Sequence, residues 1–204
     1  MGRLPVTGRN GFKAFVFCLL LTWVCGCALQ KSAATDRTQA MKGIRRIAVL
    51  PVKGMAEDEK LIRLMREKVR ENLYFRGYPK VPLEVVDEKL SKAGGEESGG
   101  IANPIPGDVR QSLGVDAVLY IDLKEFEKSA GYIYSSVSVS AVFELRNAGT
   151  GETLWRNQYQ DVIRNFSAGA SGREMAIRQV LEPAIQEVVD KGLQTFPEGP
   201  DAVL

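Results

Sequence analysis

YIYSSVSVSAVFELR, residues 132–146, decides the fold, because apolar and polar residues alternate along it with a period of two. The apolar face carries Ile133, Val137, Val139, Ala141, Phe143 and Leu145, and the opposite face carries Tyr132, Tyr134, Ser136, Ser138, Ser140, Glu144 and Arg146. The alternation predicts a long strand, and its apolar side is expected to face a core.

The segments next to this strand predict its sheet partners. Residues 147–151 read as a turn, and 152–163 return as a hairpin strand in which Trp155 and Tyr159 share one face. Core packing is the preferred interpretation of that aromatic pair, with partner anchoring as the alternative. Apolar, β-branched runs at 44–52 and 115–126 predict two further strands, and Leu83–Asp87 reads as a short one set off by Pro79 and Pro82.

Helical spacing appears in three places. Apolar residues from Leu61 to Tyr74 form an amphipathic stripe that ends at Gly77, and residues 106–113 predict a brief helix. A long helix over 175–193 follows a Ser/Gly-rich bend at 167–172, and Pro183 is expected to kink or divide it. The predicted order is β-α-β-α-β-β-β-α, a single α/β (α+β) domain with helices packed on a mixed, mainly antiparallel sheet.

The N-terminus reads as a secretory leader. Arg3, Arg9 and Lys13 precede an uncharged run at 14–24, which is shorter than the roughly 20 apolar residues of a spanning helix. Val24-Cys25-Gly26-Cys27 resembles the bacterial lipobox, although Cys25 departs from its usual small residue, and predicts a fatty-acylated Cys27 that holds the chain on a membrane. By the sorting rule of Gram-negative envelopes, Ala28 points to the outer membrane, with the domain facing the periplasm.

These features divide the chain into four predicted parts. Residues 1–26 are a signal peptide, 27–43 a lipidated flexible tether, 44–195 the α/β domain, and 196–204 a disordered tail in which Pro197, Gly199 and Pro200 oppose a helix.

Composition narrows the classes of function. Without Arg3, Arg9 and Lys13, the chain has 27 − 3 = 24 basic residues against 25 acidic ones, so it offers no basic footprint for nucleic acid. The chain has no His, and its three Cys all lie at or before Cys27, so no cofactor or zinc site is expected.

Three groups of residues are candidates for phosphate binding, catalysis or partner binding. Residues 94–100 are glycine-rich but lack the Gly-Lys-Ser/Thr ending of a phosphate-binding loop. The carboxylates of Asp116, Asp122, Glu125 and Glu127 could serve a hydrolase, and ordinary surface pairing is the preferred interpretation. Tyr132, Tyr134, Ser136 and Ser138 form a candidate partner-binding face, because Tyr and Ser suit adaptable recognition; the alternative that a helix covers this face stays open.

Four segments carry a family resemblance: IAVLP (47–51), VVDE (85–88), LGVDAVLYI (113–121) and GTGETLW (149–155). The chain resembles a family of bacterial lipoproteins of unknown function typified by a neisserial surface antigen, and that family is similar in fold to the TolB N-terminal domain, CsgG and LpoB. The resemblance implies a non-enzymatic module that assembles with other envelope proteins, CsgG-like lipoproteins among them, or with copies of itself. It suggests an auxiliary transport or secretion component, with activation of a peptidoglycan synthase as the alternative. A hydrolase that uses the carboxylates is the less favoured alternative, and it rests on those residues and not on the resemblance.

Overall fold

A sheet of five strands carries the domain, in the computed structural model that describes residues 41, 43–54, 59–93, 108–131, 134–166 and 169–202. The strands β1 (Ile47–Val49) and β2 (Lys53–Gly54) pair in parallel with β3 (Ala117–Ala130). The strands β3, β4 (Tyr134–Asn147) and β5 (Thr153–Phe166) form an antiparallel meander of 14-residue strands. The result is the predicted single α+β domain with a mixed, mainly antiparallel sheet.

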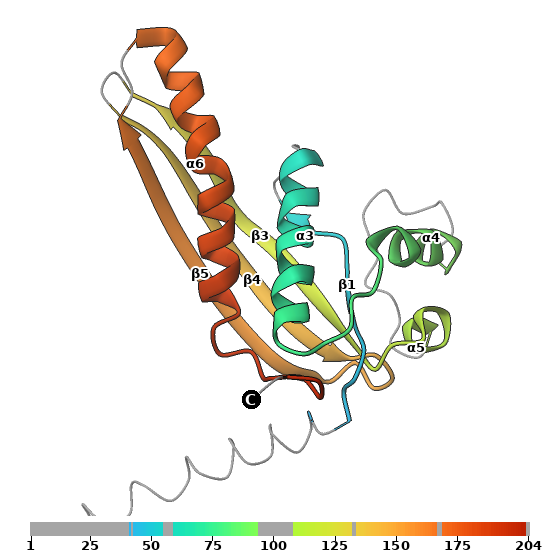
Figure 1. The fold of residues 1–204 in the computed structure, drawn as a ribbon. Coiled ribbons are helices and arrows are strands. Elements are labelled where there is room, and N and C mark those ends of the chain that lie inside the picture. The colour runs from blue at the N-terminus through green and yellow to red at the C-terminus, as the bar shows by residue number, and fades with distance from the viewer. Residues whose placement is uncertain are drawn as a thin grey trace, which may run out of the picture. The chain divides into compact units, whose positions relative to one another are not determined.

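Two of the four helices in the described part of the chain cover one face of the sheet. The helices α3 (Glu59–Phe75) and α6 (Gly169–Gly192) lie over the meander, with α6 running along β4 and β5 (Figure 1). The apolar face of β4 is buried here as its alternation predicts, with Val137, Val139, Ala141, Phe143 and Leu145 fully inaccessible. Trp155 and Tyr159 of β5 pack against the same core, which confirms core packing for that pair.

A second, smaller core lies around β1 and the start of β3. Val86 and Leu90 of α4 (Leu83–Ala93) and Leu113 at the end of α5 (Asp108–Leu113) pack there with Leu50 and Val118. The helices α4 and α5 therefore cover only one end of the sheet's other side (Figure 1).

The predicted strand at Leu83–Asp87 is wrong, because these residues begin α4. The carbonyl of Pro82 accepts the amide of Val86 at 3.2 Å, so the proline marks the start of a helix rather than the edge of a strand. Leu83, Val86 and Leu90 recur at helical spacing; Leu83 packs in the main core, and Val86 and Leu90 pack in the smaller one. Arg66 on α3 then binds the Asp87 carboxylate through both terminal nitrogens, at 2.8 and 2.9 Å, and fixes α4 against α3.

Two boundaries also differ from the sequence prediction. Lys53–Gly54, which lie just beyond the predicted strand at 44–52, form the short strand β2. The long helix begins at Gly169, inside the predicted Ser/Gly-rich bend, and runs through Pro183 as one element.

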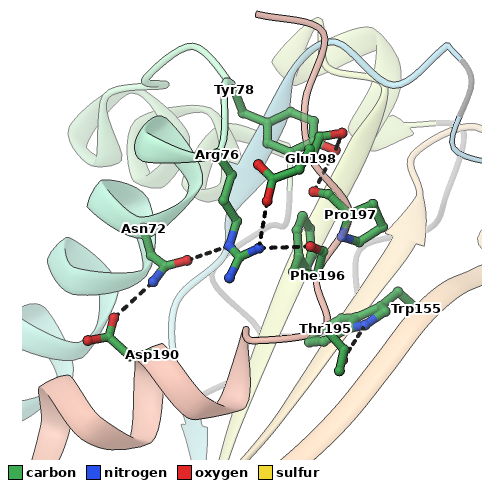
Figure 2. A network of polar contacts seen from close by, with 9 residues as sticks. All are labelled: Asn72, Arg76, Tyr78, Trp155, Asp190, Thr195, Phe196, Pro197 and Glu198. Carbon is green, nitrogen blue, oxygen red and sulfur yellow. Dashed lines mark hydrogen bonds and ion pairs between the residues drawn. The ribbon is translucent and has the colours of Figure 1, made fainter. Parts of the chain in front are cut away.

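The predicted disordered tail at 196–204 is wrong for residues 196–202. Phe196 is buried in the main core between the rings of Tyr78 and Trp155. Arg76, at the end of α3, donates to the Phe196 carbonyl at 2.9 Å and to Glu198 at 3.3 Å, and Asn72 links Arg76 to Asp190 of α6 (Figure 2). The prolines and glycine oppose a helix, but they leave the segment free to pack in an extended form.

Because Tyr78 packs against this C-terminal segment, its hydroxyl makes the stability of the fold depend on pH in the alkaline range. Burial, assisted by the negative charge of Glu198, raises the pKa of the Tyr78 hydroxyl to about 12. Because the folded pKa exceeds the unfolded value of 10.0, this contribution to stability is complete below pH 10 and is lost as the pH rises toward 12.

We therefore expect the free energy of unfolding to fall less in Tyr78→Phe than in wild type between pH 10 and 12, by up to about 2 kcal/mol. At pH 7 the substitution should cost no more than about 1 kcal/mol, because both hydrogen bonds of the hydroxyl, to the carbonyls of Pro197 and Glu198, are long at 3.4 Å. Urea midpoints at pH 8 and pH 11 for wild type and variant measure the effect, and parallel profiles would contradict it.

Candidate interaction surface

The face of the meander opposite α3 and α6 is the candidate surface, and we call it the open face. The β4 residues that point to it pair directly across to β5: Tyr134 with Phe166, Ser136 with Arg164, and Ser138 with Val162. On the other side, Ser136 pairs with Ser129 and Ser138 with Glu127 of β3. Three strands thus hold these side chains in one fixed array.

An aromatic pair lies at the end of the open face where β4 begins and β5 ends. The rings of Tyr134 and Phe166 meet edge to face, with centroids 6.2 Å apart and an interplanar angle of 84°. Tyr134 is 59% exposed and Phe166 65%, and the neighbouring Val162 is also exposed. An exposed apolar group of this kind, framed by polar side chains, is typical of a binding surface.

The middle of the open face is a polar row across the three strands. Ser138 donates its hydroxyl proton to one carboxylate oxygen of Glu125, and the Gln160 amide donates to the other at 3.1 Å. The row orients Ser138 and Gln160 and leaves the aromatic pair as the apolar part of the surface.

A charged cluster bounds the end of the open face near α5. Arg146 donates to Glu144 at 2.8 Å and stacks over the ring of Tyr120 at 4.9 Å, while Thr153 donates to Glu144 at 2.6 Å. These hydrogen bonds, Arg146 first, lower the pKa of the Glu144 carboxyl, so it is a stable anion at neutral pH.

The structure places the predicted site residues as follows. Tyr134, Ser136 and Ser138 share the open face, whereas Tyr132 and the glycine-rich segment 94–100 lie outside the described residues. The exposure of Tyr134 decides against burial of its ring under a helix. Binding by these residues stays a prediction.

Phe166 and Val162 were missed as surface residues. The predicted strand ends at Ile163, whereas β5 and its alternation continue to Phe166. The even-numbered apolar residue Phe166 is the available signal, because from Arg156 onward the even positions of β5 are exposed.

Three of the four carboxylates considered for catalysis, Asp116, Asp122 and Glu125, are engaged in other contacts. Asp116 accepts the backbone amides of Arg45 and Arg46, at 2.9 and 3.0 Å, and so fixes the entry into β1. Asp122 pairs with Lys124, and Glu125 binds Ser138 and Gln160. This matches the surface pairing preferred from the sequence.

The described residues show neither a metal-binding cluster nor a membrane-spanning helix. Within them, no group of three or more His, Cys, Asp or Glu side chains is arranged to hold a metal ion. In the same part of the chain, no helix combines the length and apolar character needed to cross a membrane.

Comparisons with known proteins place the chain in a family. The family model "Putative lipoprotein GNA1162-like" matches residues 39–198. "Putative lipoprotein NMB1124/NMB1162" of Neisseria meningitidis serogroup B is 28% identical over 120 residues, which are 58% of this chain and 55% of the relative, so the match spans about half of the relative's length.

A solved neisserial relative shares the fold. Lipoprotein GNA1162 from Neisseria meningitidis is 27% identical, with a TM-score of 0.50 over 68% of this chain and 96% of that chain. The LpoB C-terminal domain from Salmonella enterica is 13% identical, with a TM-score of 0.42 over 61% of this chain and 91% of that one, a similarity too low to indicate a shared role. The descriptions of the two neisserial relatives name lipoproteins and no enzymatic activity. Because the family model covers most of its length, the chain belongs to the GNA1162-like lipoprotein family.

Proposed function

We propose that this lipoprotein is a non-enzymatic module of the bacterial outer membrane that binds another envelope protein through its open face. The observation that carries the proposal is the exposed Tyr134–Phe166 pair on a sheet whose other side is packed against α6. Membership of a lipoprotein family supports the envelope location. We further propose that it serves as an auxiliary component of a transport or secretion system.

The physical character of the open face suits protein recognition. Aromatic side chains provide large contact areas at a low cost in side-chain entropy, and such anchors often carry most of the binding energy of an interface. Ser136, Ser138, Gln160 and Arg164 surround the pair with hydrogen-bonding groups, which fits the polar rim of an interface. The core packing of β4 holds the array in place before a partner binds, so little ordering is required on association.

Mild crosslinking of intact membranes, followed by identification of the captured protein, tests this function. We expect a reproducible adduct between the lipoprotein and a second envelope protein. An adduct with further copies of the chain would support self-assembly instead, and the absence of any adduct would contradict the proposal.

The proposed anchor is an acylated Cys27, followed by Ala28 as the signal for the outer membrane, with the domain in the periplasm. We expect Cys27→Ser to abolish fatty-acid labelling and to release the protein from the membrane while the domain stays folded. The first buried residue among those described, Ile44, lies 44 − 27 = 17 positions later, so the described core begins well beyond the substituted position. Metabolic labelling with a palmitate analogue measures acylation, and a labelled, membrane-held variant would refute the assignment.

A further inference from the structure

A second exposed aromatic pair ends α3. Phe75 is 82% exposed and Tyr74 51%, and their rings meet at a centroid distance of 5.8 Å. The ammonium group of Lys80 lies 4.5 Å from the centroid of the Tyr74 ring, on the exposed segment that follows the helix. Tyr74, Phe75 and Lys80 form what we call the base cluster. The burial of the α3 stripe ends at Leu73, so the fold itself leaves these aromatic rings in water.

The base cluster lies at the end of the domain where the described chain begins. From Ile44, β1 runs alongside β3, and α3 returns in the opposite direction, so the last turn of α3 comes back to the level at which β1 starts (Figure 1). Ile44 and Tyr78 belong to one core cluster, against which Met41 packs. The C-terminal segment closes the same end, with the Gly199 amide bound to the Arg76 carbonyl at 2.6 Å.

The length of chain before Met41 limits how far this end can lie from a lipid at Cys27. The separation is 41 − 27 = 14 residues, which spans at most about 50 Å even when fully extended. An attachment this short keeps the base cluster near the bilayer at a high effective concentration, so a contact that is weak by itself becomes populated.

The chemistry of the base cluster matches the surface of a bilayer. Aromatic rings favour the boundary between headgroups and acyl chains, and a lysine beside them can place its ammonium among the phosphates. Arg45 and Arg46, both exposed at the entry to β1, add positive charge at the same end. Basic residues close to an anionic leaflet are attracted to its negative surface potential.

We propose that Tyr74, Phe75 and Lys80 form a second membrane contact, which rests the base of the domain on the leaflet that holds the acylated cysteine. This inference depends on the proposed anchoring at Cys27. With the base on the lipid, the open-face pair at the other end of the meander points into the periplasm, away from the anchor.

The cysteine distribution allows a direct test. All three Cys of the chain lie at or before residue 27, so the processed, acylated protein carries no free thiol. Phe75→Cys therefore provides a single site for an environment-sensitive fluorophore. Met175→Cys provides a matched control, because Met175 is also exposed, at 61%, but lies near the start of α6 at the other end of the domain.

The acylated variants are reconstituted into vesicles of phosphatidylethanolamine and phosphatidylglycerol that contain a lipid with a nitroxide on its acyl chain. We expect the label at position 75 to shift its emission to the blue and to be quenched several-fold more strongly than the label at 175. Adding Lys80→Glu to the Phe75→Cys variant should reduce that quenching.

Flotation and quenching separate the two claims. Protein that floats with the vesicles but shows equal quenching at both positions would overturn the membrane contact and leave the anchor intact. If the label at position 75 were quenched only after other envelope proteins had been added to the vesicles, the membrane contact would also be overturned, in favour of a protein partner. Wild-type protein that proves to carry no acyl chain and fails to float would overturn the anchor together with the contact that depends on it.

Discussion

Phe196→Ala is expected to lower the free energy of unfolding by about 3–5 kcal/mol, as truncation of a buried aromatic ring does. Phe196 is only 3% exposed, and its ring meets those of Tyr78 and Trp155 edge to face at centroid distances of 5.9 and 4.9 Å. Removing the ring leaves a cavity between α3, β5 and the C-terminal segment (Figure 2). The urea midpoint of unfolding measures the loss.

Glu198→Gln is the matched control for this prediction. Its carboxylate pairs with Arg76 at 3.3 Å and is largely exposed, so the substitution should cost less than about 1 kcal/mol. If Phe196→Ala were as mild as Glu198→Gln, the C-terminal segment would contribute little to the domain, and the tail would behave as the sequence predicts.

The double substitution Tyr134→Ala with Phe166→Ala is expected to reduce partner capture about 30-fold or more, because an aromatic hot spot commonly contributes about 2 kcal/mol or more. Both rings are exposed, so the cost in stability should stay within about 2 kcal/mol, most of it from the ring contact and the small buried fraction. Capture is measured as crosslinking yield in membranes, and stability as the urea midpoint.

Val85→Ala with Met175→Ala is the control, since both side chains are apolar and exposed but lie on the helices α4 and α6, outside the open face and the base cluster. This control should leave capture by the open face unchanged. Equal capture by wild type and the Tyr134/Phe166 variant would contradict the role of the open face, and so would a stability loss of several kcal/mol, which would make the pair structural.

The meander could be predicted from the sequence because its signal is local. Alternation along 132–146 assigns each residue of β4 to one face, and Phe143 and Leu145 are buried accordingly. The amphipathic stripe of α3 likewise ends in Gly77, whose φ of +87° suits glycine after a helix.

The two main errors concern segments whose structure depends on distant residues. LEVVD at 83–87 is too short for its period to separate helix from strand, and Arg66 on α3 helps to hold the helix in place. Phe196 gains its place from Arg76, 120 positions earlier, and from Trp155 on β5. Contacts between residues so far apart produce no periodic pattern in the sequence.

Only part of the candidate surface could be predicted, because the rest also depends on contacts between residues that are distant in the sequence. The composition of β4 predicted a face with Tyr134, Ser136 and Ser138, but the pairing of Tyr134 with Phe166 follows from the register between β4 and β5. A register shift near Leu145 and Arg146 sets that pairing, and the sequence of either strand alone does not reveal it.

Site-specific photocrosslinking at position 134 tests the central claim most directly. Tyr134 is replaced by a photoreactive phenylalanine analogue in the acylated protein in native membranes, and the same analogue replaces the exposed Val85 of α4 as the control. We predict that position 134 captures one defined envelope protein and that position 85 does not. An equal pattern of adducts at both positions, or adducts at position 134 with lipid alone, would contradict the proposal that the open face binds a protein partner.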